Sequence, residues 1–162
     1  IEDEFFDTEI TFVDYVEEIV RSYKEISNKK FIINLDQFKY SVRSFKSSEI
    51  VYGLRNFIGN ANKFSNDKVE IILKSNKKDT EVIIRDDGPG FPKDLIDKHK
   101  LGEPYIRTSD SAHTSKYGLG LGTFIGKTLL EKNFAKIVFK NSIKNGGAEV
   151  FIKWTNKDLA NI

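Results

Sequence analysis

The chain contains no cysteine and no methionine among its 162 residues, and only 3 prolines and 1 tryptophan. Without cysteine, it cannot itself form a disulfide framework, a thiolate metal site or a redox-active thiol. It also has no signal-peptide pattern and no apolar run near the roughly 20 residues that span a membrane. Because methionine is absent and residue 1 is isoleucine, we expect the sequence to be a domain of a longer protein.

An excess of one charge is absent as well: 26 basic residues stand against 24 acidic ones, mixed along the sequence. Such a balance gives no reason to expect nucleic acid or a membrane surface as the main partner. Hydrophobic residues make up 39% and charged residues 31%, which is typical of a globular protein. The length predicts one domain with its own core, over residues 1–155, followed by a loosely ordered tail over 156–162.

Hydrophobic periodicity indicates the order of helices and strands. Apolar residues at helical spacing predict helices over 12–23 and 49–65, and a third that begins in 118–122. Shorter apolar runs predict strands over 31–35, 69–74, 81–85, 135–140 and 148–154, with a weaker one within 40–45. This order predicts an α+β fold, a two-layer sandwich with helices packed on one face of a mixed, mostly antiparallel sheet.

The helix predicted over 49–65 carries an unusual polar edge. Asn56, Asn60 and Lys63 follow one another at i, i+4 and i+7, beside a stripe of apolar residues. Asparagine is a poor choice for helix propensity alone. Two interpretations remain open from this helix by itself: a solvated edge, or a site for a cation and phosphate oxygens. Ser47 or Ser48 is expected to cap the helix.

A glycine-rich corner follows the strand predicted over 81–85. Its pattern is D-x-G-x-G, formed by Asp86, Gly88 and Gly90. Glycines allow a sharp turn and a close approach to a ligand, and a fixed carboxylate can accept a hydrogen bond from an exocyclic amine such as that of adenine. An ordinary turn is the alternative, because Asp-Gly and Pro-Gly pairs are common in turns.

A second glycine run, Gly118, Gly120 and Gly122, opens the third helix, where free N–H groups favour anions. It lacks the preceding strand of a dinucleotide fingerprint, and Leu121 stands where a P-loop ending at 126–128 needs its first glycine. The polar stretch 102–117 before it is typical of a functional lid. One side of the helix is expected to be marked by Leu121, Phe124, Ile125, Thr128 and Leu129, with Lys132 as a further candidate.

Taken in order, these motifs resemble those of the ATP-binding domains of histidine kinases, which have the Bergerat ATPase fold. The segment NFIGNANKFS is similar to the N box, RDDGPGF to the first glycine box and GLGLG to the second. The segments GEPY, GLGLGTFIGKTLLEK and NGGAEVFIKW are similar to the RegB/PrrB group of redox-responsive sensor kinases. The resemblance covers residues 49–154.

The resemblance implies that the chain binds ATP with Mg²⁺. Asn60 would hold Mg²⁺ through its carboxamide oxygen, together with phosphate oxygens, and Lys63 would neutralise phosphate charge. Asp86 would accept the adenine amine, and Gly88 and Gly90 would give the base room. Asp87 stands where the family often has asparagine, so its role is open.

For the lid, the resemblance implies that Gly118, Gly120 and Gly122 shape the hinge and the triphosphate pocket. Arg107 and Lys116 would contact phosphate, with solvated loop charges as the alternative.

The resemblance also bears on the reaction. Gyrase and MutL relatives carry a glutamate that activates water where this chain has Asn56, which cannot accept a proton. Phosphoryl transfer to a histidine is therefore expected rather than hydrolysis. Neither His99 nor His113 is followed by the acidic residue of a phosphoacceptor box. We expect the acceptor on a dimerisation hairpin outside this chain, then a response regulator, in the cytoplasmic portion of a membrane-anchored sensor. A non-catalytic nucleotide-binding or docking module is the alternative.

Overall fold

The computed structural model describes residues 9–45, 47–97, 99–103 and 120–162. The helices and strands in these ranges are, in chain order, β1 (Glu9–Thr11), α1 (Phe12–Ile26), β2 (Lys30–Phe38), β3 (Arg43–Phe45), α2 (Ser48–Phe64), β4 (Lys68–Ser75), β5 (Asp79–Asp86), α3 (Lys93–Asp97), α5 (Gly120–Lys132), β6 (Lys136–Asn141), β7 (Ala148–Thr155) and α6 (Asn156–Ala160). The helices and strands predicted from periodicity are all present, with bounds that differ by a few residues.

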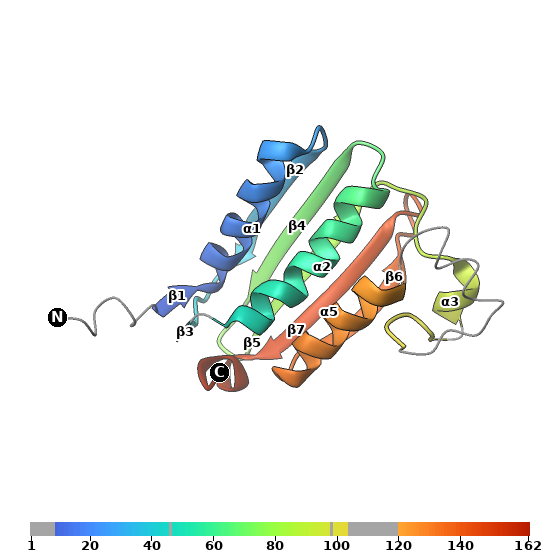
Figure 1. Cartoon of the computed structure of the whole chain (residues 1–162). Coiled ribbons are helices and arrows are strands. Elements are labelled where there is room, and N and C mark those ends of the chain that lie inside the picture. Colours follow the sequence, from blue (N-terminus) through green and yellow to red (C-terminus); the bar gives the residue numbers. More distant parts are fainter. Residues whose placement is uncertain (1–8, 46, 98, 104–119) are drawn as a thin grey trace.

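Five strands form the main sheet, in the order β2-β4-β5-β7-β6. β2 and β4 are parallel, because α2 connects them across the sheet, and the other neighbours are antiparallel. The helices α1, α2 and α5 lie side by side over one face of this sheet (Figure 1). The predicted α+β architecture, with helices packed on a mixed and mostly antiparallel sheet, is therefore confirmed.

Helix α2 lies between α1 and α5 and carries much of the core (Figure 1). It begins after Ser47, whose hydroxyl accepts a hydrogen bond from the Ile50 N–H at 3.3 Å, as the predicted cap. The predicted apolar stripe faces inward, and its fully buried members are Ile50, Leu54, Phe57, Ile58 and Ala61. Since burial of each large side chain contributes about 1.5–3 kcal/mol, this stripe fixes the rotation of α2 and the direction of its polar edge.

The contact between α5 and α2 differs from the expectation for α5. The expected set of large residues does not form the buried side of α5, because its first member, Leu121, is 71% exposed. The buried residues of α5 are Thr123, Gly126 and Leu130. A Cβ on Gly126 would lie 2.9 Å from Cε2 of Phe57, and a Cβ on Gly53 would lie 2.6 Å from Cγ of Leu130. Missing side chains, rather than large ones, allow the two helices to approach.

The loosely ordered tail expected over 156–162 is instead a short helix, α6. Thr155 caps it by accepting a hydrogen bond from the Asp158 N–H at 3.1 Å, and Leu159 is 0% exposed. Asn156 connects it to the β4–β5 hairpin, since its side chain accepts from the Thr80 hydroxyl at 2.7 Å and donates to the Asn76 carbonyl at 2.8 Å. Burial of Leu159 and these hydrogen bonds hold the segment in place.

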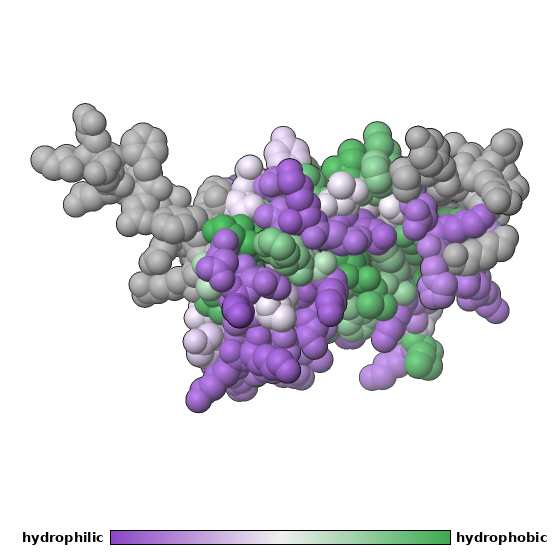
Figure 2. Space-filling view, turned by 90° about the horizontal axis from the view of Figure 1, so that it is seen from below, coloured by the Kyte–Doolittle hydropathy of each residue, from purple (hydrophilic) through white to green (hydrophobic). Residues whose placement is uncertain are grey.

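The outer surface is mainly polar on the side drawn at the bottom of Figure 1. Seen from there, hydrophilic residues cover most of the surface, and hydrophobic residues appear in several smaller groups between them (Figure 2). Within the part of the chain that the structure describes, no helix combines the length and the apolar character needed to cross a membrane.

Candidate functional site

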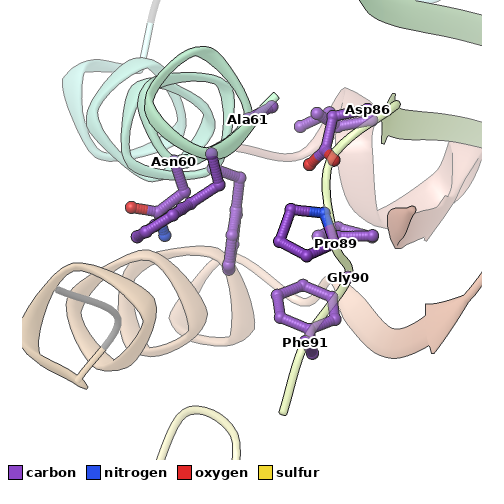
Figure 3. Close-up of a pocket in the computed structure, with 11 residues that line it drawn as sticks. Asn60, Ala61, Asp86, Pro89, Gly90 and Phe91 are labelled. Atoms are coloured by element: carbon purple, nitrogen blue, oxygen red, sulfur yellow. The ribbon is translucent and has the colours of Figure 1, made fainter. Parts of the chain in front are cut away.

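A pocket opens between α2, the corner that follows β5 and the ends of the neighbouring strands (Figure 3). Its lining residues are Phe57, Asn60, Ala61, Phe64, Ile84, Asp86, Pro89, Gly90, Phe91, Ala148 and Val150. Most of these are apolar, and the polar side chains in the lining are Asp86 and Asn60. Apolar walls with a few convergent polar groups are typical of a small-molecule site, and here they suit a flat base that carries a hydrogen-bond donor.

Asp86 stands at the last position of β5, with its carboxylate turned toward the pocket (Figure 3). The side chain is 6% exposed, and one carboxylate oxygen accepts a hydrogen bond from the Gly88 N–H at 2.8 Å. Burial raises the pKa of the Asp86 carboxyl above its ordinary value, although hydrogen bonds from the N–H groups of Gly88 and Ala148 act in the opposite direction. The group combines a buried position with a role as hydrogen-bond acceptor, as recognition of an amine requires.

Asp87, whose role the sequence leaves open, accepts hydrogen bonds from the backbone of another segment. Its carboxylate accepts hydrogen bonds from the N–H groups of Asn66, Asp67 and Lys68, at 2.8 Å, 3.1 Å and 3.1 Å. Burial by itself raises the pKa of Asp87, but these backbone hydrogen bonds outweigh it and hold the pKa below its ordinary value. Asp87 therefore fastens the corner to the loop between α2 and β4.

The glycines of the corner are required for a reason other than room for the base. A Cβ on Gly88 would lie 2.2 Å from the Phe64 carbonyl oxygen at the end of α2. Gly90 has a φ of +82°, and a Cβ there would lie 2.1 Å from the Gly146 carbonyl oxygen in the β6–β7 turn. Both positions therefore bring the backbone of the corner against another segment's backbone, while Gly90 also lines the pocket.

The two asparagines of α2 turn their carboxamides toward the start of α5. The Asn60 amide nitrogen donates to the Thr123 hydroxyl at 3.3 Å, and the Asn56 amide nitrogen donates to the Tyr52 carbonyl at 2.9 Å. A Cβ built on Gly122 would lie 3.5 Å from Oδ1 of Asn56 and 3.7 Å from Oδ1 of Asn60. Two carboxamide oxygens thus converge on the space that Gly122 leaves open.

Other predicted site residues lie farther from the pocket. Lys63 is exposed, and its ammonium stands over the Phe64 ring, 5.4 Å from the centroid. Gly120 is the first residue of α5 and is not among the lining residues. Arg107, Lys116 and Gly118 lie outside the described residues, as does His113.

Sequence reasoning missed two residues that brace the site. The Asn141 side chain accepts from the Phe91 N–H at 2.8 Å and donates to the Phe91 carbonyl at 3.0 Å, which fixes the backbone of the pocket wall at Phe91. The Lys29 ammonium donates to the Ser65 carbonyl at the end of α2 and also acts electrostatically on Asp86. Asn141 ends a strand and Lys29 follows a helix, so neither belongs to a local motif that could have signalled it.

The donor set fits a nucleotide with a shared magnesium ion. In the described ranges no cluster of three or more histidine, cysteine, aspartate or glutamate residues could hold a metal ion by itself. Magnesium is commonly bound by one or two protein oxygens together with substrate phosphates. The Asn56 and Asn60 oxygens could supply the protein part of such a site. The buried Asp86 carboxylate in an apolar pocket provides the matching group for a base.

Comparison with known proteins agrees with this geometry. The model of the family described as histidine kinase-, DNA gyrase B-, and HSP90-like ATPase matches residues 46–158. The chain belongs to this family of ATPases.

Its relatives within the family are sensor kinases. The chain is 37% identical to the sensor histidine kinase RegB of Cereibacter sphaeroides over 99 residues. This aligned stretch covers 58% of this chain and 21% of RegB. It is 35% identical over 97 residues to the histidine protein kinase SaeS of Staphylococcus aureus, which covers 57% of this chain and 27% of SaeS. The resemblance to RegB is thus confirmed, and the chain spans only about a fifth to a quarter of the length of these relatives.

Solved structures confirm the fold. The catalytic domain of the histidine kinase ThkA superposes with a TM-score of 0.72 at 21% identity, over 92% of this chain and 96% of that one. ThkA in complex with the response regulator protein TrrA superposes with a TM-score of 0.69 at 20% identity, over 93% of this chain and 42% of that one.

Proposed function

We propose that the chain is the ATP-binding catalytic domain of a two-component sensor histidine kinase. It binds ATP with Mg²⁺ and transfers the γ-phosphoryl group to a histidine on a dimerisation hairpin outside this chain. The observation that carries the proposal is the pocket in which the buried Asp86 carboxylate and the Asn60 carboxamide share one apolar lining. Membership of the ATPase family and the relatives named sensor histidine kinases support it.

The residues of the site have distinct roles in this proposal. Asp86 accepts the adenine amine between apolar walls that include Phe91 and Val150. Asn60 would hold Mg²⁺ through its carboxamide oxygen, and the ion would supply positive charge for the phosphates of bound ATP. Lys63 adds a positive charge at the exposed edge of α2. Gly122 leaves the space in which the ion and the phosphates stand near the asparagine oxygens.

Asn56 favours transfer over hydrolysis. Its amide nitrogen donates to the Tyr52 carbonyl, and a carboxamide oxygen is not basic enough to take a proton from water. Positioning and electrostatic stabilisation then supply the catalysis, and the nucleophile comes from the hairpin. In this proposal, a response regulator receives the phosphoryl group next, as the ThkA–TrrA complex suggests by likeness. The chain then lies in the cytoplasmic portion of a membrane-anchored sensor.

The test combines the chain with a separately supplied hairpin and γ-labelled ATP. We expect label on the hairpin histidine in the presence of Mg²⁺, and no label with Asn60→Ala, which should retain nucleotide binding measured by calorimetry. Binding of ATP without any label on the hairpin would favour a non-catalytic nucleotide module instead. Release of free phosphate without a hairpin would favour an ATPase. Transfer by Asn60→Ala at the wild-type rate would remove the metal role of Asn60.

A further inference from the structure

A buried hydroxyl group stands where α5 packs against α2. Thr123 is 1% exposed, at the first turn of α5, and its hydroxyl accepts a hydrogen bond from the Asn60 amide nitrogen at 3.3 Å. Thr123 itself is not among the residues that line the pocket. It therefore touches the predicted metal-binding side chain without forming part of the pocket wall.

Next to Thr123 this helix–helix contact is mainly apolar, and an ion pair between Lys132 and Glu49, at 3.0 Å, stands at the other end of α5. Gly126 meets the Phe57 ring, and Gly53 meets the Leu130 side chain. A buried hydroxyl costs free energy unless it has a hydrogen-bond partner, and an aliphatic side chain of the same size, such as valine, would avoid that cost. Packing alone therefore does not account for threonine at position 123, whereas its contact with Asn60 does.

The contact decides which end of the Asn60 carboxamide faces the open space. The Thr123 hydroxyl engages the nitrogen, and the oxygen is the nearer end to the open space, since a Cβ on Gly122 would lie 3.7 Å from the oxygen and 4.0 Å from the nitrogen. The Asn56 nitrogen is likewise held by the Tyr52 carbonyl, and its oxygen would lie 3.5 Å from the same Cβ. Both oxygens face one point because both nitrogens are engaged elsewhere.

We propose that Thr123 is a positioning residue, which holds the Asn60 carboxamide with its oxygen directed to the Mg²⁺ ion of bound ATP. The inference rests on the proposed function, and it assigns to the hydroxyl a role in metal affinity rather than in nucleotide affinity. A carboxamide that rotates freely presents its N–H₂ group to the cation part of the time, which weakens coordination.

The experiment compares Thr123→Val, which keeps the shape and removes the hydroxyl, with Thr123→Ser, which keeps the hydroxyl and removes the methyl group. Thr123→Ala is a second variant without a hydroxyl, in case valine disturbs the fold. Thr128→Val is the matched control, because the same chemical change is made on the exposed side of the same helix. Each full chain is titrated with ATP at a series of Mg²⁺ concentrations, and with ATP in excess chelator.

We expect Thr123→Val and Thr123→Ala to need about threefold to tenfold more Mg²⁺ for half-maximal strengthening of ATP binding, as expected for loss of one hydrogen bond. Affinity in chelator should not change, and Thr123→Ser and Thr128→Val should match the wild type. A wild-type Mg²⁺ dependence in Thr123→Val would overturn the proposal. Equal weakening with and without Mg²⁺ would also overturn it, because that result indicates a purely structural role.

A second readout needs no nucleotide. In the ligand-free chain, the side-chain N–H₂ signals of Asn60 in ¹⁵N NMR should shift and exchange faster with water in Thr123→Val than in Thr123→Ser. Unchanged signals would contradict the contact itself. If the wild type shows no Mg²⁺-dependent ATP binding, the proposed function fails, whereas this measurement still decides whether Thr123 holds Asn60.

Discussion

The site is built from two regions that use glycine in opposite ways. In the corner that follows β5, the atom nearest to the missing side chain belongs to the backbone, namely the Phe64 carbonyl at Gly88 and the Gly146 carbonyl at Gly90, with the Asn141 side chain next at Gly90. In the contact between α2 and α5, the neighbours are side chains: the Phe57 ring fills the space of the missing side chain at Gly126, whereas the asparagine oxygens border the space that Gly122 leaves open.

This difference assigns the two regions different physical tasks. Backbone carbonyls at the corner cannot move without shifting α2 or the β6–β7 turn, so the corner holds Asp86 at a fixed place. Side chains between the helices can change rotamer, so the helix contact tolerates adjustment as a ligand binds. Recognition of a rigid base suits the first region, and coordination of an ion with flexible phosphates suits the second.

The strongest test of this comparison is an alanine at Gly90. Its φ of +82° disfavours a side chain, and the new Cβ would stand 2.1 Å from the Gly146 carbonyl oxygen. We expect Gly90→Ala to lower the free energy of unfolding by about 3 kcal/mol or more, from both causes together. Chemical denaturation followed by circular dichroism measures it.

Gly146→Ala is the matched control for that substitution. Gly146 also has a positive φ, +76°, but a Cβ there would meet nothing within 4 Å. Gly146→Ala should therefore lower the free energy of unfolding by only the cost of a side chain at positive φ, about 1 kcal/mol. Equal losses for the two variants would show that the close approach of the corner to the β6–β7 turn has no energetic importance.

Asp86→Asn separates the function of the corner from its stability. A charge-assisted hydrogen bond to the adenine amine is worth about 1.5–3 kcal/mol, so we expect ATP to bind roughly tenfold more weakly or worse. Calorimetry with ATP measures this, and adenosine should lose affinity in parallel because the contact is with the base. Unchanged affinity would count against Asp86 as the group that recognises adenine.

The difference in folding stability between the same variant and the wild type should depend on pH with a definite sign. Because the folded-state pKa of Asp86 is raised by burial, the folded chain holds this proton more tightly than the unfolded chain. Ionisation of Asp86 therefore costs stability as the pH rises from about 4, the ordinary pKa, through the folded-state pKa. Asp86→Asn removes that cost, so it should be at least as stable as the wild type at pH 7, with a difference that shrinks in acid.

The two regions also differ in how far the sequence predicts them. The corner and the α2 stripe depend on local signals: the Ser47 cap, the apolar spacing of α2 and the D-x-G-x-G pattern all lie within a few residues of the features they specify. The sequence motifs assign Asn60 and Asp86 to one site, and both residues line the same pocket.

What could not be predicted depends on which segments meet in space. The buried side of α5 follows from the facing glycine Gly53 on α2, and the role of Thr123 follows from Asn60, 63 positions earlier. The role of Asp87, which the sequence leaves open, is to accept hydrogen bonds from backbone N–H groups about 20 positions earlier. Asn141 braces Phe91 across a separation of 50 positions. Periodicity and turn chemistry carry no information on such contacts.

The smallest expected change in stability comes from Gly122→Ala, in the second region. Its Cβ would be in ordinary contact with the asparagine oxygens, and alanine favours a helix over glycine, so the free energy of unfolding should stay the same or rise by about 0.5 kcal/mol. The methyl group would nevertheless stand where the two oxygens converge. We expect the Mg²⁺-dependent part of ATP affinity to fall about threefold or more, as for loss of about 0.7 kcal/mol.

Gly126→Ala provides the contrast on the same helix. Its Cβ would meet the Phe57 ring at 2.9 Å and the Asn56 Cβ at 3.2 Å, with neither asparagine oxygen among its nearest atoms, so it should lower stability while changing the Mg²⁺ dependence of ATP binding less than Gly122→Ala does. If Gly122→Ala binds Mg²⁺ and ATP as the wild type does, the ion does not occupy the space between Asn56 and Asn60. The second region would then serve helix packing alone, and the division of tasks between the two regions would not hold.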